Sequence, residues 1–205
     1  MDTCKKCRRA GEKLFLKGER CTLPKCAMVR KNYSPGVHGG KIKRRTSEYG
    51  MQLAVKQRLK HMYGIRERSL KNYFSKVKNK SGDIGEMLLQ KLEARLDNVV
   101  YRSGIARSRR EARQMVNHGM FLVAGREVDI PSYEVKVGSE IKIKESKAKK
   151  TALAERVKEA EKRMPPADWV NVDYKSGVIK VLNIPSRKDI GEESDVQMVI
   201  EYYSR

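Results

Sequence analysis

Residues 108–119 read SRREARQMVNHG and carry the signals for the start, the buried face and the end of one helix. Ser108 with Glu111 three residues later forms a capping box, in which each side chain accepts a hydrogen bond from a free amide at the helix start. Three apolar residues recur at the spacing of one helix face: Ala112, Met115 and Val116. Gly119 then supplies a C-terminal stop. The stretch predicts a short helix with one face packed against a core.

Five arginines surround the expected start of this helix. They are Arg102, Arg107, Arg109, Arg110 and Arg113. A helix N-terminus attracts phosphate through its dipole and its free amide groups. His118, at the other end of the helix, is assigned to capping or to an RNA contact. The basic helix end is the arrangement expected of a surface that recognises RNA.

Apolar periodicity upstream predicts three more helices. The first begins after Ser47 and ends at Gly64, the second ends before Gly82, and the third begins with Asp83 as its N-cap. The residues expected to face the core are, in order, Met51, Val55 and Leu59; Leu70, Tyr73, Phe74 and Val77; and Leu88, Leu89, Leu92, Leu96 and Val99.

Short apolar segments downstream predict strands. The expected strands are 121–123, 127–129, 135–137, 141–143, 169–172 and 178–181. Residues 149–163 predict a surface helix, and Trp169 is expected in a core. The last ten residues fit either a helix or a strand, and a capping pair at Ser194 and Gln197 favours the helix.

All four cysteines lie within the first 26 residues, as Cys4-x2-Cys7 and Cys21-x4-Cys26. Two close pairs separated by a short loop match the ligand spacing of a tetrahedral zinc site. Neighbouring lysines and arginines would help to hold the thiols as thiolates. We expect one Zn²⁺ with a structural role, since four protein thiolates leave no position for a catalytic water.

Two disulfides are the first alternative for these cysteines, but they need an oxidising compartment, and the N-terminus has no apolar secretion segment. A redox dithiol at Cys4 and Cys7 is the second. Such dithiols accompany a βαβ pattern, which this region lacks.

The net charge of +21 is concentrated at one end of the chain. Residues 1–80 carry +18, whereas the remaining residues are almost balanced. An extended surface that follows RNA phosphates explains this asymmetry, because each neutralised phosphate releases condensed counterions. An anionic membrane surface is the alternative, but no apolar run approaches the ~18 residues of a transmembrane helix.

The candidate RNA contacts outside the arginine-rich helix come from the basic region. They are Arg8, Arg30, Lys31, Tyr33, His38, Lys43, Arg44, Arg45, Lys56, Arg58, Lys60, Arg66, Arg68 and Lys71. Tyr33 and His38 lie in a loop rich in glycine and proline, where rings among cations can stack on unpaired bases. No phosphate loop, nucleophile elbow or zinc-protease motif is present, so the sequence predicts no enzyme.

Several motifs resemble one family over almost the whole chain. Residues 4–7 (CKKC) and 16–26 (LKGERCTLPKC) resemble the zinc-bearing form of bacterial ribosomal protein S-four, and residues 33–39 (YSPGVHG) resemble a loop of the same family. Residues 92–102 (LEARLDNVVYR), with 108–114 and 118–119, are similar to its RNA-binding module. Residues 128–133 (VDIPSY) and 200–205 (IEYYSR) are similar as well.

The resemblance implies a primary binder of 16S-type ribosomal RNA in the small subunit. Such a protein nucleates assembly at a multi-helix junction of the 5′ domain, contributes to translational accuracy, and acts in the ribosome in the cytoplasm. The implied partners are ribosomal protein S-five and messenger RNA near the entry channel. The implied fold is α+β, with a small antiparallel sheet. It has a zinc-binding arm (1–45), a helical domain (46–91, joined by 186–205) and an inserted α+β domain (92–185) that holds the RNA-binding module at about 93–155.

Two other functions are alternatives to ribosomal RNA binding. An RNA-modifying enzyme can carry a similar module, but it needs a catalytic domain for which this chain has too little length. A DNA-binding zinc protein would present a recognition helix beside its metal. Competition between structured ribosomal RNA and duplex DNA distinguishes these classes.

Overall fold

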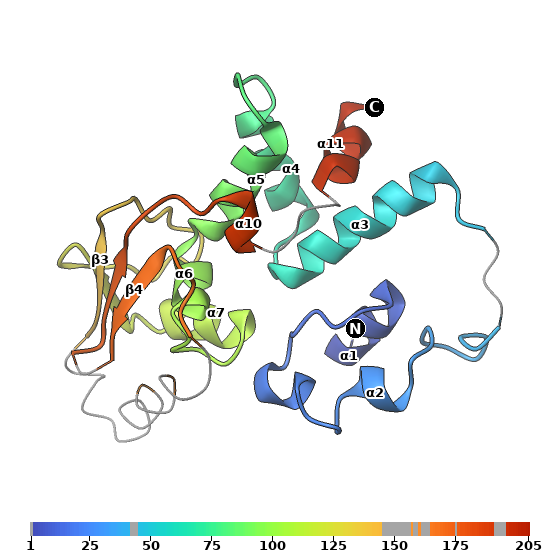
Figure 1. Ribbon diagram of the computed structural model, residues 1–205, viewed down its shortest axis with the longest axis horizontal. Coiled ribbons are helices and arrows are strands. Elements are labelled where there is room, and N and C mark those ends of the chain that lie inside the picture. The colour runs from blue at the N-terminus through green and yellow to red at the C-terminus, as the bar shows by residue number, and fades with distance from the viewer. Residues whose placement is uncertain are drawn as a thin grey trace. The chain divides into compact units, whose positions relative to one another are not determined.

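The computed structural model describes residues 2–41, 45–144, 157, 160, 165–174, 176–190 and 196–205. It divides into two compact units (Figure 1). Unit 1 comprises residues 1–85 and 192–205, and unit 2 comprises residues 86–191. Unit 1 is therefore built from both ends of the chain, whereas unit 2 is one continuous segment.

Unit 1 begins with three short helices, α1 (Thr3–Ala10), η1 (Gly18–Cys21) and α2 (Ala27–Arg30). The carboxylate of Asp2 accepts a hydrogen bond from the Cys4 amide and caps α1. Gly11, at φ 83°, ends the same helix in the left-handed conformation that glycine adopts without a Cβ clash. Because these helices are too short to be stable alone, a small buried cluster of cysteines, Leu14 and Met28 holds them together.

Helices α3 (Glu48–Met62) and α4 (Glu67–Val77) follow. Ser47 caps α3 as predicted, by accepting from the Gly50 amide. The expected apolar stripe of α3 is confirmed at Leu59 only, because Met51 is 44% exposed, Val55 is half-buried, and the other buried residues are Gln52 and Lys56. Two of these three residues are polar: the amide nitrogen of Gln52 donates to Glu48 and Glu201, and the ammonium of Lys56 donates to Glu67. The stripe of α4 is confirmed, with Leu70, Phe74 and Val77 buried.

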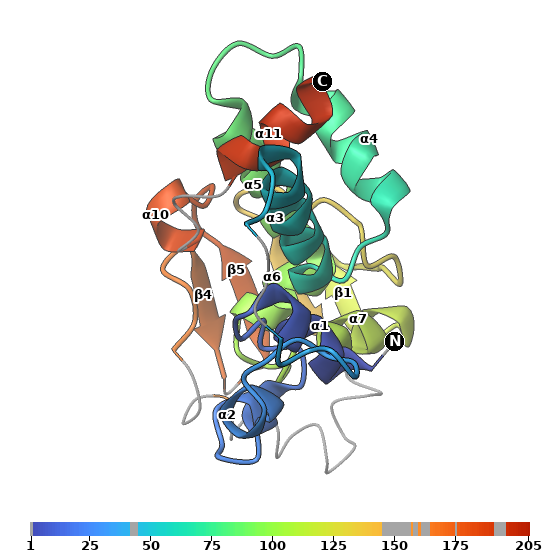
Figure 2. The same ribbon diagram turned by 90° about the vertical axis from the view of Figure 1, so that its right-hand side faces the viewer.

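Nine of the last ten residues form helix α11 (Val196–Ser204), which lies against α3 and α4 in both views (Figures 1 and 2). Val196 and Val199 are buried, and the ring of Tyr203 stacks on Phe74 with 5.1 Å between centroids. The helical prediction for the C-terminus is therefore confirmed. The expected cap at Ser194 lies outside the described residues.

The chain passes from unit 1 into unit 2 within α5 (Ile84–Glu93), and unit 2 also contains α6 (Leu96–Arg102) and α7 (Arg109–Asn117). Asp83 accepts from the Gly85 amide at the start of α5, as predicted. The expected third helix is divided into α5 and α6, because the chain turns at Ala94 and Arg95. The capping box of α7 is present. The Ser108 hydroxyl accepts from the Glu111 amide at 3.2 Å, and the Glu111 carboxylate accepts from the Arg107 amide at 2.8 Å.

The sheet of unit 2 has the strand order β2-β1-β3-β5-β4 with every pairing antiparallel. Its strands are β1 (Phe121–Val123), β2 (Arg126–Glu127), β3 (Glu140–Ile143), β4 (Val170–Asp173) and β5 (Val178–Val181). Phe121 pairs with Ile143, and Ile141 pairs with Ile179. Buried residues of α6, α7 and the strands form one apolar core that includes Trp169, as predicted.

The strand expected at 135–137 does not form. The Val135 amide donates to the carbonyl of Ala94, and the Leu96 amide donates to the carbonyl of Tyr133. The backbone of this segment is thus satisfied by the turn between α5 and α6, where a single bridge joins Arg95 to Glu134. Most of the helix expected at 149–163 lies outside the described residues. A short helix, α10 (Arg187–Ile190), follows the sheet.

Candidate nucleic-acid interface

The four thiols of unit 1 gather around the small core of the arm. Cys7, Cys21 and Cys26 are buried and Cys4 is half-buried, and all four are free thiols. The Lys17 amide donates to the sulfur of Cys21 at 3.4 Å. Burial raises the pKa of the Cys7 thiol, and the other three thiols raise it further, while a backbone hydrogen bond at Leu14 lowers it.

The donor set suits a soft cation such as Zn²⁺, because thiolates are its preferred ligands and three of the four sulfurs are shielded from water. Cys7 and Cys26 belong to one small buried cluster with Leu14 and Met28. Within the described residues, however, no group of three or more potential ligands has the geometry of a metal site. The cysteines are therefore together but not arranged as a closed coordination shell.

Arg8 ties the loop that follows α2 to helix α1. Its Nε donates to the carbonyl oxygens of Lys31 at 3.1 Å and Tyr33 at 2.9 Å, and its Nη2 donates to that of Ser34 at 3.2 Å. Its guanidinium also lies 4.6 Å from the centroid of the Tyr33 ring. These contacts fix the loop, and Tyr33 itself stays 46% exposed. The geometry gives Arg8 a positioning role that the sequence did not reveal.

The remaining arm candidates lie on the surface. Arg30, Lys31, His38 and Arg45 are exposed. Lys43 and Arg44 lie outside the described residues. On the helices that follow, Arg66, Arg68 and Lys71 are exposed and make no ion pair with any described residue. Arg58 is half-buried and pairs with Glu12.

Lys56 lies inside unit 1 and not on its surface, with only 3% of the residue exposed. Its ammonium donates to Glu67 Oε1 at 2.6 Å and lies 4.2 Å from the centroid of the Tyr202 ring. Lys60 donates to Glu67 Oε2 at 3.1 Å, and the Tyr203 hydroxyl donates to Oε1 at 2.8 Å. Three donors from α3 and α11 thus meet one carboxylate of α4.

The same network sets the charge state of Glu67. Burial is the largest influence and raises the pKa of this carboxyl, but the hydrogen bonds from Lys56, Tyr203 and Lys60 together lower it to about 2. Burial, and then the neighbouring carboxylate, raise the pKa of Tyr203. Glu67 is therefore ionised at neutral pH and holds both lysines.

A second network, in unit 2, is built on the side chain of Glu93, which is completely buried. Arg102 donates to both of its oxygens, at 2.9 and 2.8 Å, and the Asn98 amide donates at 2.6 Å. Arg109 approaches the same carboxylate at 3.7 Å, donates to Asn98 Oδ1 at 2.8 Å and lies 4.6 Å from the centroid of the Tyr101 ring. Arg102 and Arg109 therefore fasten α5, α6 and α7 to one another.

The other arginines of this cluster are more accessible. Arg113 reaches Asp97 at 3.3 Å with 45% of its side chain exposed, while Asp97 is also held by Arg95 at 2.6 Å. Arg107 and Arg110 are exposed beside them. His118 is exposed at the end of α7. The structure thus brings the five predicted arginines together, but it divides them into an inner pair and an outer three.

Sequence reasoning missed the acidic and amide groups that organise this cluster. Glu93, Asp97 and Asn98 lie in a stretch where apolar residues predicted core packing, and all three are buried. A signal was available, because a buried acid is stable only with a cationic or hydrogen-bonding partner, and Arg102 follows Glu93 by nine residues.

Among the helices that the structure describes, none has the length and apolar character needed to cross a bilayer.

Comparisons with known proteins give consistent similarities. Residues 2–93 match the family described as the ribosomal protein S4/S9 N-terminal domain, and residues 94–141 match the S4 domain. The chain is 49% identical over 203 residues to the small ribosomal subunit protein uS4 of Acetivibrio thermocellus, across 99% of this chain and 97% of that protein. It is 48% identical over 202 residues to the uS4 protein of Thermus thermophilus, across 98% and 96%. It is 46% identical over 203 residues to that of Clostridioides difficile, across 99% and 97%.

Proposed function

Because the chain belongs to the ribosomal protein S4 family, we propose that it is a structural constituent of the small ribosomal subunit that binds 16S-type ribosomal RNA. Its role is architectural and not catalytic. The observation that carries the proposal is that both units present exposed cations, while Glu67 and Glu93 are engaged by cations inside their own units. The excess cations behind the net charge of +21 are therefore exposed, where they can bind a polyanion.

The first proposed contact surface is on unit 1. It is formed by the exposed residues Arg30, Lys31, Tyr33, His38, Arg45, Arg66, Arg68 and Lys71, with Lys43 and Arg44 retained from the sequence. Lys56 is left out because it is buried. Cations along the arm neutralise phosphates, and the exposed Tyr33 ring offers a face on which an unpaired base can stack.

The second proposed contact surface is the start of α7. Arg107, Arg110 and Arg113 are its outer cations, and the inner pair, Arg102 and Arg109, keeps the helices in position through Glu93. Phosphate contacts of this kind fix orientation and carry no sequence information, so we expect this surface to recognise the shape of the folded RNA.

The finer features follow from the family and are part of the proposal. The protein nucleates subunit assembly at a multi-helix junction of the 5′ domain and contributes to translational accuracy. It lies next to ribosomal protein S-five, near messenger RNA at the entry channel, in cytoplasmic ribosomes. We also propose the division into an arm (1–45), a helical domain (46–91 with 186–205) and an α+β domain (92–185).

We propose further that Cys4, Cys7, Cys21 and Cys26 hold one structural Zn²⁺ as thiolates. The bound metal would supply a cross-link between two segments of an arm whose apolar core is small. Metal analysis of the purified, reduced protein is expected to give one equivalent of zinc per chain, and chelation to weaken RNA binding by the arm. Two stable disulfides without metal would reject this assignment.

The test of the main proposal uses ribosomes purified from the source and washed in high salt. The chain is expected to remain with the small subunit when peripheral proteins are released, because specific binding exceeds non-specific phosphate binding in affinity by several orders of magnitude. Its recovery in the wash, or in complexes with DNA and not with ribosomal RNA, would reject the proposal.

A further inference from the structure

Helix α7 presents two exposed arginines that differ in how they are held. Arg113 donates from Nη1 to Oδ2 of Asp97 at 3.3 Å, and 45% of its side chain remains exposed. Arg110 is exposed on the same helix and makes no hydrogen bond or ion pair with any residue that the structure describes. The two cations therefore share a helix, a charge and contact with solvent, and they differ in one bond to an acid.

The acid that holds Arg113 is itself fixed from two sides. Asp97 is 4% exposed, and Arg95, which is 3% exposed, donates to both of its carboxylate oxygens, at 3.0 and 2.6 Å. The backbone between these two residues is tied as well, because the Leu96 amide donates to the carbonyl oxygen of Tyr133 at 2.8 Å. A bidentate pair on a fixed backbone gives Arg113 a support that stays in one place.

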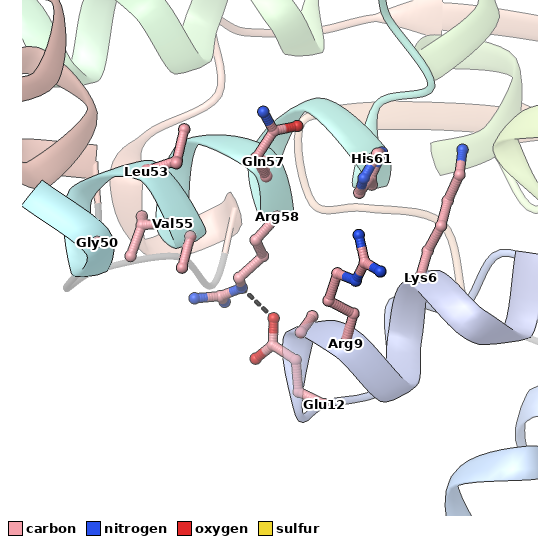
Figure 3. A pocket seen from close by; sticks show the side chains of 11 residues that line it. Lys6, Arg9, Glu12, Gly50, Leu53, Val55, Gln57, Arg58 and His61 are labelled. Atoms are coloured by element: carbon pink, nitrogen blue, oxygen red, sulfur yellow. Dashed lines mark ion pairs between the residues drawn. The ribbon is translucent and has the colours of Figure 1, made fainter. Parts of the chain in front are cut away.

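This support orients Arg113 without cancelling its charge. The Asp97 carboxylate lies between two guanidiniums, and the buried one, Arg95, offsets its negative charge at closer range. The group as a whole therefore stays positive towards solvent. Arg58 in unit 1 is held in a different way, because Glu12 is directed at Arg58 itself and offsets its charge directly (Figure 3).

The inner arginines of the same cluster are also held, but they are not open to solvent. Only 15% of the Arg102 side chain and 14% of the Arg109 side chain are exposed, and both lie against the buried carboxylate of Glu93. Arg113 combines the two properties, since it is held by an acid as the inner pair is and exposed as Arg110 is.

Holding a cation changes what it can bind. A free arginine side chain reaches phosphates in many positions, and it loses rotamer freedom each time it binds one. A held guanidinium has already lost that freedom, so it binds well only where a phosphate lies at the place to which it points. Asp97 accepts from one N–H group of Arg113 and leaves other donors of the planar fork for a bidentate phosphate contact.

We propose that Arg113 is a specificity-determining residue of the second contact surface, and that Asp97 and Arg95 are its positioning residues. Arg113 favours a folded RNA that places a phosphate at this point over a regular duplex, whereas Arg110 adds affinity for either. This inference rests on the proposed function, because it assigns the discrimination between RNAs to one cation of a surface already proposed to bind ribosomal RNA. Charge alone does not produce the difference, since Arg113 and Arg110 carry the same charge.

The first experiment compares two ligands of the full-length protein, a transcript of the 5′ domain of 16S ribosomal RNA and a duplex RNA of mixed sequence. Arg113→Lys keeps the charge and loses the planar fork, so it should weaken binding of the transcript about tenfold and change binding of the duplex by less than about twofold. Arg110→Lys is the matched control on the same helix and should change both affinities by less than about twofold. The dependence on salt should stay the same in both variants, because each keeps its cation.

The second experiment removes the support and keeps Arg113. Arg95→Met combined with Asp97→Asn removes both buried charges together, so that neither is left unpaired. This variant should bind the transcript about tenfold more weakly, and adding Arg113→Lys to it should cause no further loss. The Nε–H signal of Arg113 in NMR spectra should also shift when the support is removed, and the fluorescence of Trp169 shows whether unit 2 is folded. Because Arg113→Lys changes an exposed side chain, the first experiment does not depend on the stability of this variant.

The outcomes separate this inference from the proposed function. Equal effects of Arg113→Lys and Arg110→Lys on the transcript, or an equal loss of transcript and duplex in Arg113→Lys, would overturn the role of Arg113 and leave the proposed function in place. Losses that add when the support and Arg113 are changed together would overturn Asp97 and Arg95 as its positioning residues. A wild-type protein that binds the duplex as tightly as the transcript would reject the proposed function itself.

Discussion

Each unit builds a network around one deeply buried charge, Lys56 in unit 1 and Glu93 in unit 2, and the two networks draw their partners from different distances along the chain. In unit 2 the buried anion is Glu93, and its partners Asn98, Arg102 and Arg109 follow within sixteen residues. In unit 1 the buried cation is Lys56, and the carboxylate that holds it also accepts from Tyr203, 136 residues further along the chain. The Glu93 network is local in sequence, whereas the Lys56 network needs the last helix.

This difference shows how cations that look alike in the sequence have different tasks. Lys56, Arg102 and Arg109 appeared in the sequence as members of basic patches, but each is engaged by an acid inside its unit. The two networks also differ in how much of the chain each unit needs in order to fold. Unit 2 can close around Glu93 from a continuous segment, while unit 1 is complete only when α11 joins α3 and α4.

The largest expected effect is the loss of the buried anion of unit 2. Glu93→Ala leaves Arg102 and Arg109 beside an empty site, and should lower the free energy of unfolding by about 3–5 kcal/mol. The fluorescence of Trp169, the only tryptophan in the chain, reports this unit because it lies in its core. Asp129→Ala, which changes an exposed acid of the same unit, is the control and should change stability by less than about 0.5 kcal/mol. Equal small effects of both variants would contradict the importance of the network.

A smaller effect is expected in unit 1. Glu67→Ala removes the carboxylate that serves Lys56 and Lys60, and should cost about 2 kcal/mol because a charged hydrogen-bond partner is lost from a buried ammonium. The helical circular dichroism should report the change, and the Trp169 transition should stay in place. The double variant Lys56→Met with Glu67→Ala should recover stability, since no buried charge remains. A double variant less stable than Glu67→Ala alone would refute this explanation.

The contribution of helix α11 to the stability of unit 1 can be measured by removing one oxygen atom. Tyr203→Phe removes the hydroxyl that donates to Glu67 and keeps the ring against Phe74, so we expect a loss of about 1 kcal/mol. Tyr133→Phe, with a side chain on the surface of unit 2, is the matched control and should leave the unfolding midpoint unchanged. A Tyr203→Phe variant as stable as the wild type would show that the hydroxyl makes no net contribution.

The smallest effect is a pH dependence of unit 1. The folded-state pKa of Glu67 is about 2, below its ordinary value of 4.5, so its contribution to stability is complete above pH 4.5 and is lost as the pH falls from 4.5 through 2. Because 44% of the side chain is exposed, solvent screening makes this contribution modest. The difference in helix unfolding between wild type and Glu67→Gln should shrink across this window. An unchanged difference would contradict the assignment.

Local signals in the sequence predicted much of the fold. The caps at Ser47, Asp83 and Ser108 are present because each acts within three residues of the helix that it begins. Strands 121–123 and 178–181 were predicted with their correct limits, and the C-terminal helix was predicted as well. The five arginines around α7 were also correctly gathered into one cluster.

The failures come from partners that are distant in sequence. The stripe of Met51 and Val55 is wrong because Gln52 and Lys56 find acids on other helices, with Gln52 reaching Glu201, 149 residues away. Apolar and polar residues alternate at 135–137 as they do in a strand, but the backbone of this segment forms its hydrogen bonds with the turn between α5 and α6. The positioning role of Arg8 depends on carbonyl groups more than twenty residues away, and residue type does not reveal such contacts.

The proposed function requires that the exposed cations of both units bind one folded ribosomal RNA. Competition binding tests it most directly, with the full-length protein, a labelled transcript of the 5′ domain of 16S ribosomal RNA, and unlabelled duplex DNA as competitor at moderate salt. We expect the transcript to be retained against a DNA excess of several orders of magnitude, and its affinity to fall steeply as the salt concentration is raised. Displacement of the transcript by an equal mass of duplex DNA would contradict it.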